Sequence, residues 1–272
     1  MKKVLLLLII PFLSLGQNCD LEDLTYVPDD SFENYIETNF PAADNGFVND
    51  DYVITSGLNF WGQPNISSVV LSPSVLNNPI FDLTGIEDIR GANTISIQNQ
   101  MINSADLSCV QFHNQYNGGA IEIEDCPLLE SVTLPHDTLC NLSIADNPLL
   151  SNVVFNDDIV YGMTTGNINF SQNNLCEIIP KGSVESSYYL QLTIQGANLY
   201  QIDLSNLNTV YNAYFGLGGA INQIIFNNNS IYDWTSIVVG AQDLQCVNVS
   251  DPNYCSLSSV WGGFDDALFS TS

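Results

Sequence analysis

The sequence has 272 residues, of which 30 are Asp or Glu and 4 are Lys or Arg, giving a formal net charge of −26 at pH 7. Nucleic acids and anionic membrane surfaces need clustered basic side chains, so this charge excludes both as expected partners. Hydrophobic residues make up 45% of the chain and charged residues 12%, which is too apolar for a disordered acidic tail. We therefore expect an acidic surface around a folded core.

Residues 1–16 have the features of a secretory signal peptide. Two lysines are followed by an apolar run over residues 4–13, and small residues precede a cleavage point before Gln17. The run is far shorter than the roughly 20 apolar residues that cross a bilayer, so a membrane span is not expected. Cys19 would suit a lipoprotein, but it follows Asn18 rather than a small residue. The sequence predicts a protein that is secreted or held on the extracellular surface.

A short amphipathic helix is expected over residues 31–39, within an N-terminal cap that spans residues 17–60. Asp29 or Asp30 suits the N-cap position, and Glu33 lies three residues after Asp30 as in a capping box. The apolar side chains of this helix would face the rest of the fold: Phe32, Tyr35 and Ile36.

The middle of the chain repeats with a period of about 21 residues, short enough for a solenoid built from strands. Residues 120–134 and 141–155 match at every apolar position. Each unit holds two short apolar-x-apolar segments, the pattern of a strand with one buried face, separated by turn-forming residues. A single unit cannot bury its apolar face, so successive units must stack. We therefore predict a mainly β solenoid over residues 61–245 with these side chains inside: Ile121, Ile123, Leu142, Ile144, Ile168, Phe170, Leu192 and Ile194.

The segment Leu139-x-x-Leu142-x-Ile144-x-x-Asn147 has the pattern of a leucine-rich-repeat core. The doubled form of this unit resembles the short leucine-rich repeats of secreted proteins of the Bacteroidetes. Three further segments resemble the N-terminal cap, the first repeat and the C-terminal closing segment of that family: residues 27–33, 82–88 and 246–269. The resemblance implies a degenerate leucine-rich-repeat-like solenoid with a short helical N-terminal cap. It also implies that Asn147 and Asn173 stack inside, with Cys126 at the same position of one unit.

The C-terminal cap expected over residues 246–272 contains the one disulfide candidate. Cys246 and Cys255 flank the turn signal at residues 251–253, which can bring two cysteines within bridging distance. The mature chain has seven cysteines, so at least one stays unpaired. The remaining ones are expected to be buried small apolar residues.

If the first strand of each unit stacks in register, polar side chains form two rows on its outer surface. The first row would contain Ser96, Glu122, Ser143, Asn169, Thr193 and Tyr214. The second would contain Gln98, Glu124, Ala145, Ser171 and Gln195. Such a surface suits recognition of a protein or carbohydrate through many weak hydrogen bonds. The alternative is that these positions are polar only because they face solvent.

Motifs for catalysis or metal binding are scarce. His113 and His136 are the only histidines, and neither stands in a zinc or hydrolase motif. Glu122 and Glu124 would lie roughly 7 Å apart, similar to an inverting glycosidase pair, but a flat sheet offers no apolar pocket to raise one pKa. No catalytic residue, metal ligand or cofactor is therefore expected, with Ca²⁺ left open at three oxygen-rich turns: residues 44–46, 49–51 and 156–158.

These observations predict a secreted or cell-surface recognition module without enzymatic activity. Its unidentified ligand would be a protein or a glycan, bound through the solenoid surface, and neither a nucleic acid nor a membrane. A structural spacer or adhesin segment, whose repeats supply only length, is the first alternative. A glycoside hydrolase that uses Glu122 and Glu124 is the second.

Overall fold

The fold is mainly β, with one short α-helix near its N-terminal end. The computed structural model describes residues 23–270 apart from 62–67, 114–117, 158, 162–164, 176, 180, 185–188, 197–199, 204, 206, 209–211, 220–222, 226–235, 240–245, 249–260 and 263–267. The helices in this part are α1 (Asp30–Asn39) and two 3-10 turns, η1 (Thr55–Leu58) and η2 (Ile86–Asp88). The strands are β1 (Leu24–Tyr26), β2 (Tyr52–Ile54), β3 (Ser68–Leu71), β4 (Arg90–Ala92), β5 (Thr94–Gln98), β6 (Ser104–Asp106), β7 (Gln111–Phe112), β8 (Gly119–Glu124), β9 (Ser131–Thr133), β10 (Thr138–Ala145), β11 (Asn152–Val154), β12 (Val160–Tyr161), β13 (Thr165–Ser171), β14 (Glu177–Ile178), β15 (Gly182–Val184), β16 (Tyr189–Gly196), β17 (Gln201–Asp203), β18 (Leu207–Asn208), β19 (Asn212–Gly219), β20 (Gln223–Ile225), β21 (Ser236–Val239), β22 (Cys246–Asn248), β23 (Trp261–Gly262) and β24 (Leu268–Ser270).

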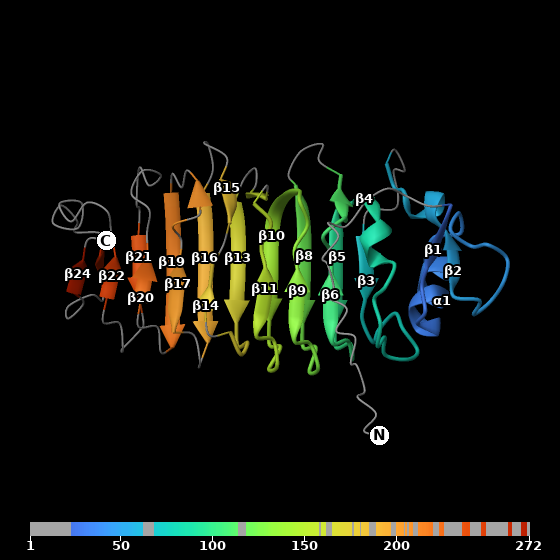
Figure 1. Cartoon of the computed structure of the whole chain (residues 1–272), viewed down its shortest axis with the longest axis horizontal. Coiled ribbons are helices and arrows are strands. Elements are labelled where there is room, and N and C mark those ends of the chain that lie inside the picture. Colours follow the sequence, from blue (N-terminus) through green and yellow to red (C-terminus); the bar gives the residue numbers. More distant parts are fainter. Residues whose placement is uncertain are drawn as a thin grey trace, which may run out of the picture.

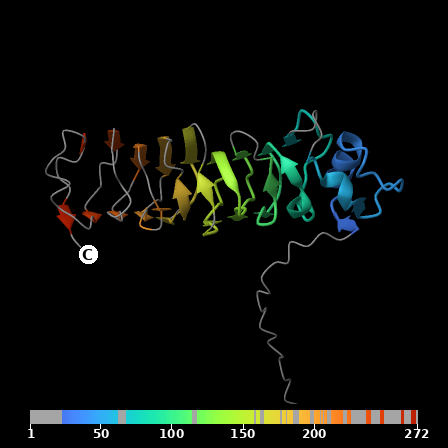
Figure 2. The same cartoon turned by 90° about the horizontal axis from the view of Figure 1, so that it is seen from above.

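The strands stack in sequence order as a parallel β-solenoid (Figure 1). One large sheet joins, in order, β3, β5, β8, β10, β13, β16, β19, β21 and β23. The opposite side consists of a three-stranded sheet, β6, β9 and β11, and a five-stranded sheet, β14, β17, β20, β22 and β24. Figure 2 shows these strands as two rows with the interior between them. Coils from β5 onward therefore contribute one strand to each side, as the paired apolar segments of the sequence predict. Several coils add a third, short strand: β4 pairs with β7, and β12, β15 and β18 pair in series.

The coils differ in length, so the repeat period seen in the sequence does not hold throughout. Cys126 and Asn147 occupy the same corner of successive coils at a sequence separation of 21. The next step, from Asn147 to Asn173, has a separation of 26. From Asn141 onward β10 stays in register with both β8 and β13, after a bulge between Leu139 and Asn141 that shifts its pairing with β8. Strand pairing thus fixes the stacked segments, while the loops between them absorb the extra residues.

The predicted core is confirmed wherever its side chains are described. Ile121, Ile123, Leu142, Ile144 and Phe170 are all at most 2% exposed. Their burial follows from the alternation of inward and outward side chains along a strand. The side chains of the other three predicted core residues lie outside the described part of the chain: Ile168, Leu192 and Ile194.

A ladder of buried polar side chains follows one corner of the coils: Gln100, Cys126, Asn147 and Asn173. The Asn147 side-chain nitrogen donates to the carbonyls of Ile123 (3.1 Å) and Ala145 (2.8 Å). Its Oδ1 accepts the backbone N–H of Cys126 at 3.0 Å. Asn173 makes the same kind of contacts one coil later, accepting the N–H of Asn147 and donating to a carbonyl. An interior amide therefore satisfies backbone groups that no strand partner reaches.

Each residue of this corner ladder follows a residue with left-handed backbone. Asn99, Asp125, Asp146 and Gln172 have φ between 53° and 57°. Asn and Asp tolerate this conformation better than other non-glycine residues. The corner thus needs a left-handed residue and then an interior hydrogen-bonding residue, which explains the repeated Asp-Cys and Asp-Asn pairs at residues 125–126 and 146–147.

The helical cap begins at Asp29, whose carboxylate accepts the N–H groups of Ser31 (2.9 Å) and Phe32 (3.1 Å). The inward face of α1 is confirmed, because Phe32, Tyr35 and Ile36 are buried. The Tyr35 hydroxyl accepts the backbone N–H of Val70 at 2.8 Å, which ties the helix to β3. No helix in the described part of the chain has the length and hydropathy needed to cross a bilayer.

The expected capping box at Asp30 and Glu33 is wrong. Glu33 is 0% exposed, and its carboxylate accepts the backbone N–H groups of Asp50 (3.1 Å) and Asp51 (3.4 Å). Since the helix begins one residue earlier than the box requires, Glu33 points into the fold instead of back to its own N-terminus. It holds the loop before β2 against α1.

Candidate functional site

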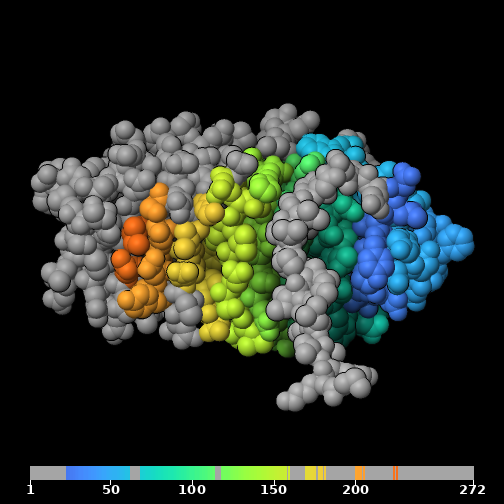
Figure 3. Space-filling model, viewed as in Figure 1, coloured from blue at the N-terminus to red at the C-terminus, as the bar shows by residue number. Residues whose placement is uncertain are grey.

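The first polar row of the large sheet is in register over five strands. Ser96 pairs with Glu122, and Glu122 pairs with Ser143. Ser143 pairs with Asn169, and Asn169 pairs with Thr193. Figure 3 shows the side chains of successive coils meeting in sequence order along the molecule. The sequence alignment of these five positions therefore matches the strand pairing.

The second row is present in two pieces. Gln98 pairs with Glu124, and Glu124 pairs with Ala145. Ser171 pairs with Gln195 on the next two strands. Between these pieces, the backbone N–H of Asp146 donates to the Ser171 carbonyl at 3.0 Å.

The placement of Tyr214 in the first row is wrong. Thr193 pairs with Gly216, whereas Tyr214 pairs with Gln191. Tyr214 consequently belongs to the row that contains Asn141 and Asn167, two residues earlier along each strand. In β19 the first-row position, which pairs with Thr193, is held by Gly216. A glycine has no side chain, so the sequence pattern does not mark this position.

Side chains of the first row bind one another and members of the two neighbouring rows across the coils. Ser143 donates to Glu124 (3.3 Å), and Asn169 donates to Ser143 (3.2 Å). Asn141 donates to Glu122 at 3.3 Å. Ser143 and Ser96 are only 8% and 5% exposed. The expectation that every member of the row faces solvent is therefore wrong for both serines, and the half-exposed members are the glutamates and Asn169.

This surface is left with unmatched hydrogen-bond acceptors. The side-chain oxygens of Asn141 and Asn169 are buried and accept no hydrogen bond from the described residues. The nitrogen of each amide already donates to the preceding coil, to Glu122 and Ser143 respectively. A carboxylate can accept about four hydrogen bonds, so each of the two glutamates also has acceptor capacity beyond its one neighbour. We call this surface of β8, β10 and β13 the acceptor face, defined by Glu122, Glu124, Asn141, Ser143 and Asn169.

Both glutamates of the proposed glycosidase pair belong to the acceptor face. Each accepts a hydrogen bond from the neighbouring coil, Glu122 from Asn141 and Glu124 from Ser143. These contacts use the carboxylates in coil stacking. The hydrolase alternative stays a prediction from their spacing alone.

A cluster of carboxylates lies at the cap. Asp30, Glu33 and Asp51 bring one oxygen each within 4.8 Å of one another. Burial raises the pKa of Glu33, although its two backbone hydrogen bonds act in the opposite direction. Because Glu33 already accepts the N–H groups of Asp50 and Asp51, its oxygens hold the loop. Calcium binding at residues 49–51 stays a prediction.

The other two oxygen-rich turns also use their side chains locally. Asp44 accepts the N–H of Gly46, and Asn45 donates to Asp50 and to the Tyr52 carbonyl. In the third turn, Asp157 pairs with Lys181 at 2.9 Å, and the Asn156 side chain donates to the Leu134 carbonyl. Both turns are therefore held by direct protein contacts.

The histidines lie apart from the acceptor face. The His113 ring packs against Trp61, with ring centroids 5.1 Å apart. His136 is exposed.

Three cysteines have described side chains, and they differ in state. Cys126 and Cys140 are free, and Cys126 is fully buried. Burial raises the pKa of the Cys126 thiol to about 11, which suits a structural residue rather than a reactive one. Cys109 is disulfide-bonded, so its expectation as a simple buried residue is wrong. The predicted Cys246–Cys255 bridge lies outside the described side chains.

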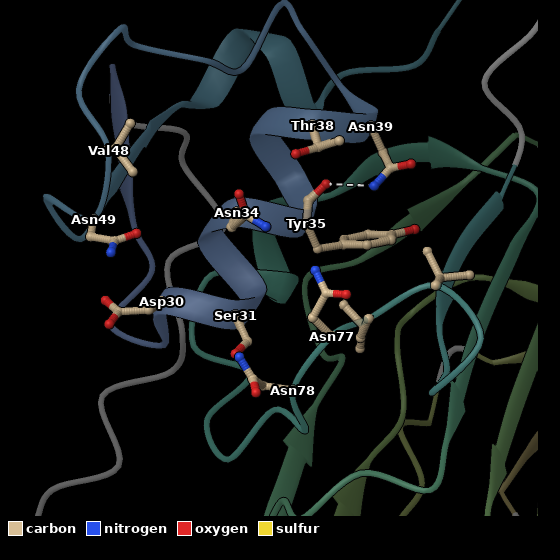
Figure 4. A pocket seen from close by; sticks show the side chains of 12 residues that line it. Asp30, Ser31, Asn34, Tyr35, Thr38, Asn39, Val48, Asn49, Asn77 and Asn78 are labelled. Atoms are coloured by element: carbon tan, nitrogen blue, oxygen red, sulfur yellow. Dashed lines mark hydrogen bonds between the residues drawn. The ribbon is translucent and has the colours of Figure 1, made fainter.

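A cleft of about 550 Å³ opens beside α1. Its walls come from the exposed side of the helix, the loop at residues 48–49 and the loop after β3. Figure 4 shows Val48 and Asn49 on one side of the helix and Asn77 and Asn78 on the other. The residues of this cap cleft were not predicted, because three separate segments supply them.

Comparison with known protein families, curated proteins and solved structures gives no match. The function is therefore argued from the geometry of the chain itself.

Proposed function

We propose that the chain is a secreted or cell-surface recognition module without enzymatic activity, which binds a basic protein segment through the acceptor face. The observation that supports this is the pair of half-exposed carboxylates, Glu122 and Glu124, each of which accepts one hydrogen bond from the described residues and keeps further acceptor capacity. Arginine and lysine carry several donors and no acceptor, so they complement such a surface.

The charge of the chain supports the same partner. Arg90 and Lys181 are the only basic residues after residue 16, giving 2 − 30 = −28 against the 30 acids. Arg90 is 3% exposed and donates to two backbone carbonyls, and Lys181 pairs with Asp157. Neither cation neutralises the acceptor face, so a basic partner would be attracted over long range.

Export is proposed from residues 1–16 and from the chemistry of Cys109. Disulfides persist in oxidising compartments, so a disulfide-bonded Cys109 supports secretion. We also propose that the solenoid is a degenerate form of the short leucine-rich repeats of the Bacteroidetes. The stacked Asn147 and Asn173 support this, since they occupy the position where that family stacks asparagine.

A structural spacer is the second candidate, and one observation favours it. Ser96 and Ser143 are buried, and Ser143 uses its hydroxyl to join adjacent coils. A row whose polar groups serve mainly coil stacking would supply length without recognition.

Binding of a synthetic nona-arginine peptide, followed by fluorescence anisotropy at low and high salt, tests the proposal. Replacing Glu122 and Glu124 together by Gln should weaken binding about tenfold, because each charged pair at a surface contributes up to about 1 kcal/mol. The matched control replaces Glu130 and Glu177, two exposed glutamates outside the acceptor face, by Gln. Equal losses in both variants would mean non-specific attraction and would favour the spacer. Added salt should slow association with the wild type.

A further inference from the structure

The cap cleft has a stripe of polar side chains along its floor. Ser31, Asn34 and Thr38 stand three and four residues apart on α1, so they share one face of the helix. The inward face of the same helix carries Phe32 and Ile36, which are 0% exposed. The amphipathic pattern that seats the helix on the solenoid therefore turns its amides and hydroxyls toward the cleft.

The lining is rich in neutral amides. Five asparagines contribute to it, together with three hydroxyl-bearing residues and one carboxylate: Asn34, Asn39, Asn49, Asn77, Asn78, Ser31, Thr38, Tyr35 and Asp30. Asn39 donates to the Tyr35 carbonyl at 2.8 Å, as the dashed line in Figure 4 shows. Within the described part of the chain, the side chains of the other four asparagines make no hydrogen bond and are exposed. Their donors and acceptors are all open to a ligand.

Apolar side chains stand at the edges of the cleft. Val48 is 77% exposed and Val75 is 48% exposed, and both line the cleft with the partly buried Leu76. Figure 4 shows Val48 across the helix from Asn77. The cleft therefore combines apolar edges with a floor of paired donors and acceptors.

We propose that the cap cleft binds a neutral oligosaccharide. A sugar hydroxyl both donates and accepts, and an amide side chain offers one group of each kind. The C–H faces of a sugar ring can pack on Val48 and Val75, which would otherwise remain exposed to water. The volume of about 550 Å³ lies within the range of about 300–1,000 Å³ that is usual for small-ligand sites.

The charge of the cleft lining favours a neutral ligand over an anionic or a strongly basic one. Among the described residues that line the cleft there is no lysine or arginine, so a phosphate or sulfate group would meet one carboxylate and no cation there. A strongly basic ligand is favoured less here than at the acceptor face, because Asp30 is the only acid in the described lining. The cap cleft is thus a second site, and its ligand differs from the basic partner proposed above.

The test uses the full mature chain and four neutral probes: cellohexaose, laminarihexaose, mannohexaose and chitohexaose. Binding is measured by isothermal titration calorimetry at low and high NaCl concentration. At least one probe should bind with a Kd below about 1 mM, and the Kd should not change with salt because the ligand carries no charge. Replacing Asn34 and Asn77 together by Ala should weaken that binding roughly ten- to a hundredfold, since each loses hydrogen bonds to the ligand.

The matched control is Asn152→Ala, which removes an exposed amide on β11 away from the cleft. Thermal unfolding of each variant shows that the fold is retained. Failure of all four probes to bind would overturn the proposal, as would binding that the Asn34 and Asn77 changes leave unaltered. The acceptor-face variant with Glu122→Gln and Glu124→Gln should bind the sugars like the wild type, so the two proposals fail independently.

Discussion

Replacing Asn147 by Ala should open the corner of the solenoid around Cys126. The side chain of Asn147 is 0% exposed and makes hydrogen bonds to three backbone groups, the N–H of Cys126 and the carbonyls of Ile123 and Ala145. Each such bond contributes about 1 kcal/mol net, and an unsatisfied buried N–H costs about 1–3 kcal/mol more. By the same reckoning, the variant should lose about 4–6 kcal/mol of local stability.

The Cys126 thiol reports this opening directly. It is fully buried, and its pKa of about 11 keeps it protonated and slow to react at pH 8. When closing is fast, the rate of alkylation by N-ethylmaleimide follows the population of the open state. A loss of about 4 kcal/mol corresponds to nearly a thousandfold faster labelling at about 1.4 kcal/mol per factor of ten. Peptide mass spectrometry measures the rate at this one thiol, in a Cys140→Ser background.

Two comparisons make the result interpretable. Asn152→Ala removes an exposed amide and should label Cys126 within a few-fold of the wild-type rate, because surface changes stay within about 0.5 kcal/mol. In Asn147→Cys, this corner carries the same residue type that Cys126 provides at the equivalent corner of the preceding coil. The Cys126 thiol should therefore be labelled more slowly in this variant than in Asn147→Ala. Labelling of Asn147→Ala at the wild-type rate would refute the role of the corner ladder.

Three further predictions concern the Cys126 thiol, two glutamates and one close backbone contact. Burial raises the pKa of Cys126 from 9.0 to about 11, so this thiol favours the folded state fully below pH 9 and that contribution is lost by pH 11. Urea unfolding should show a loss of about 3 kcal/mol across that window relative to Cys126→Ser, and equal losses in both proteins would contradict the prediction. Burial also raises the pKa of Glu33 and Glu87, which favours folding at acidic pH, so the Tm should be higher at pH 5 than at pH 8. Glu87→Gln should reduce this difference, and a Tm that falls on acidification would refute the sign. In Gly57→Ala the new Cβ would clash with the backbone that follows α1, so thermal unfolding should show a loss of at least about 1–3 kcal/mol, whereas the exposed neighbour change Ser56→Ala should show little.

The alternation of inward and outward side chains along each strand made the core residues predictable from the sequence. The coil lengths and the row of Tyr214 could not be predicted in this way. Ile121, Ile123, Leu142 and Ile144 could be assigned to the core because inward positions must alternate with outward ones. The coil lengths could not be assigned, since a loop can gain residues without moving the strands that it joins. Tyr214 was misplaced because the glycines of β19 carry no side chain that marks a row.

The functional surfaces needed contacts between segments that are distant in sequence. Ser143 is outward by alternation and yet buried, because Glu124 and Asn169 of the adjacent coils reach across to it. The cap cleft combines α1 with residues 48–49 and 75–78, and no local pattern links these segments. What the sequence did contain was an unusual supply of asparagine, spread along the whole chain.

The same amide chemistry accounts for the interior and for the cleft. With only two lysine or arginine residues after residue 16, ion pairs can satisfy few polar groups. An amide donates and accepts at once without adding charge, so Asn147 can serve an N–H and two carbonyls of the stacked backbone. At the surface the same group gives Asn34 and Asn77 an uncharged means of binding hydroxyls, whereas the glutamates of the acceptor face attract cations. Salt should therefore separate the two surfaces, weakening arginine-peptide binding while leaving both sugar binding and the corner ladder unchanged.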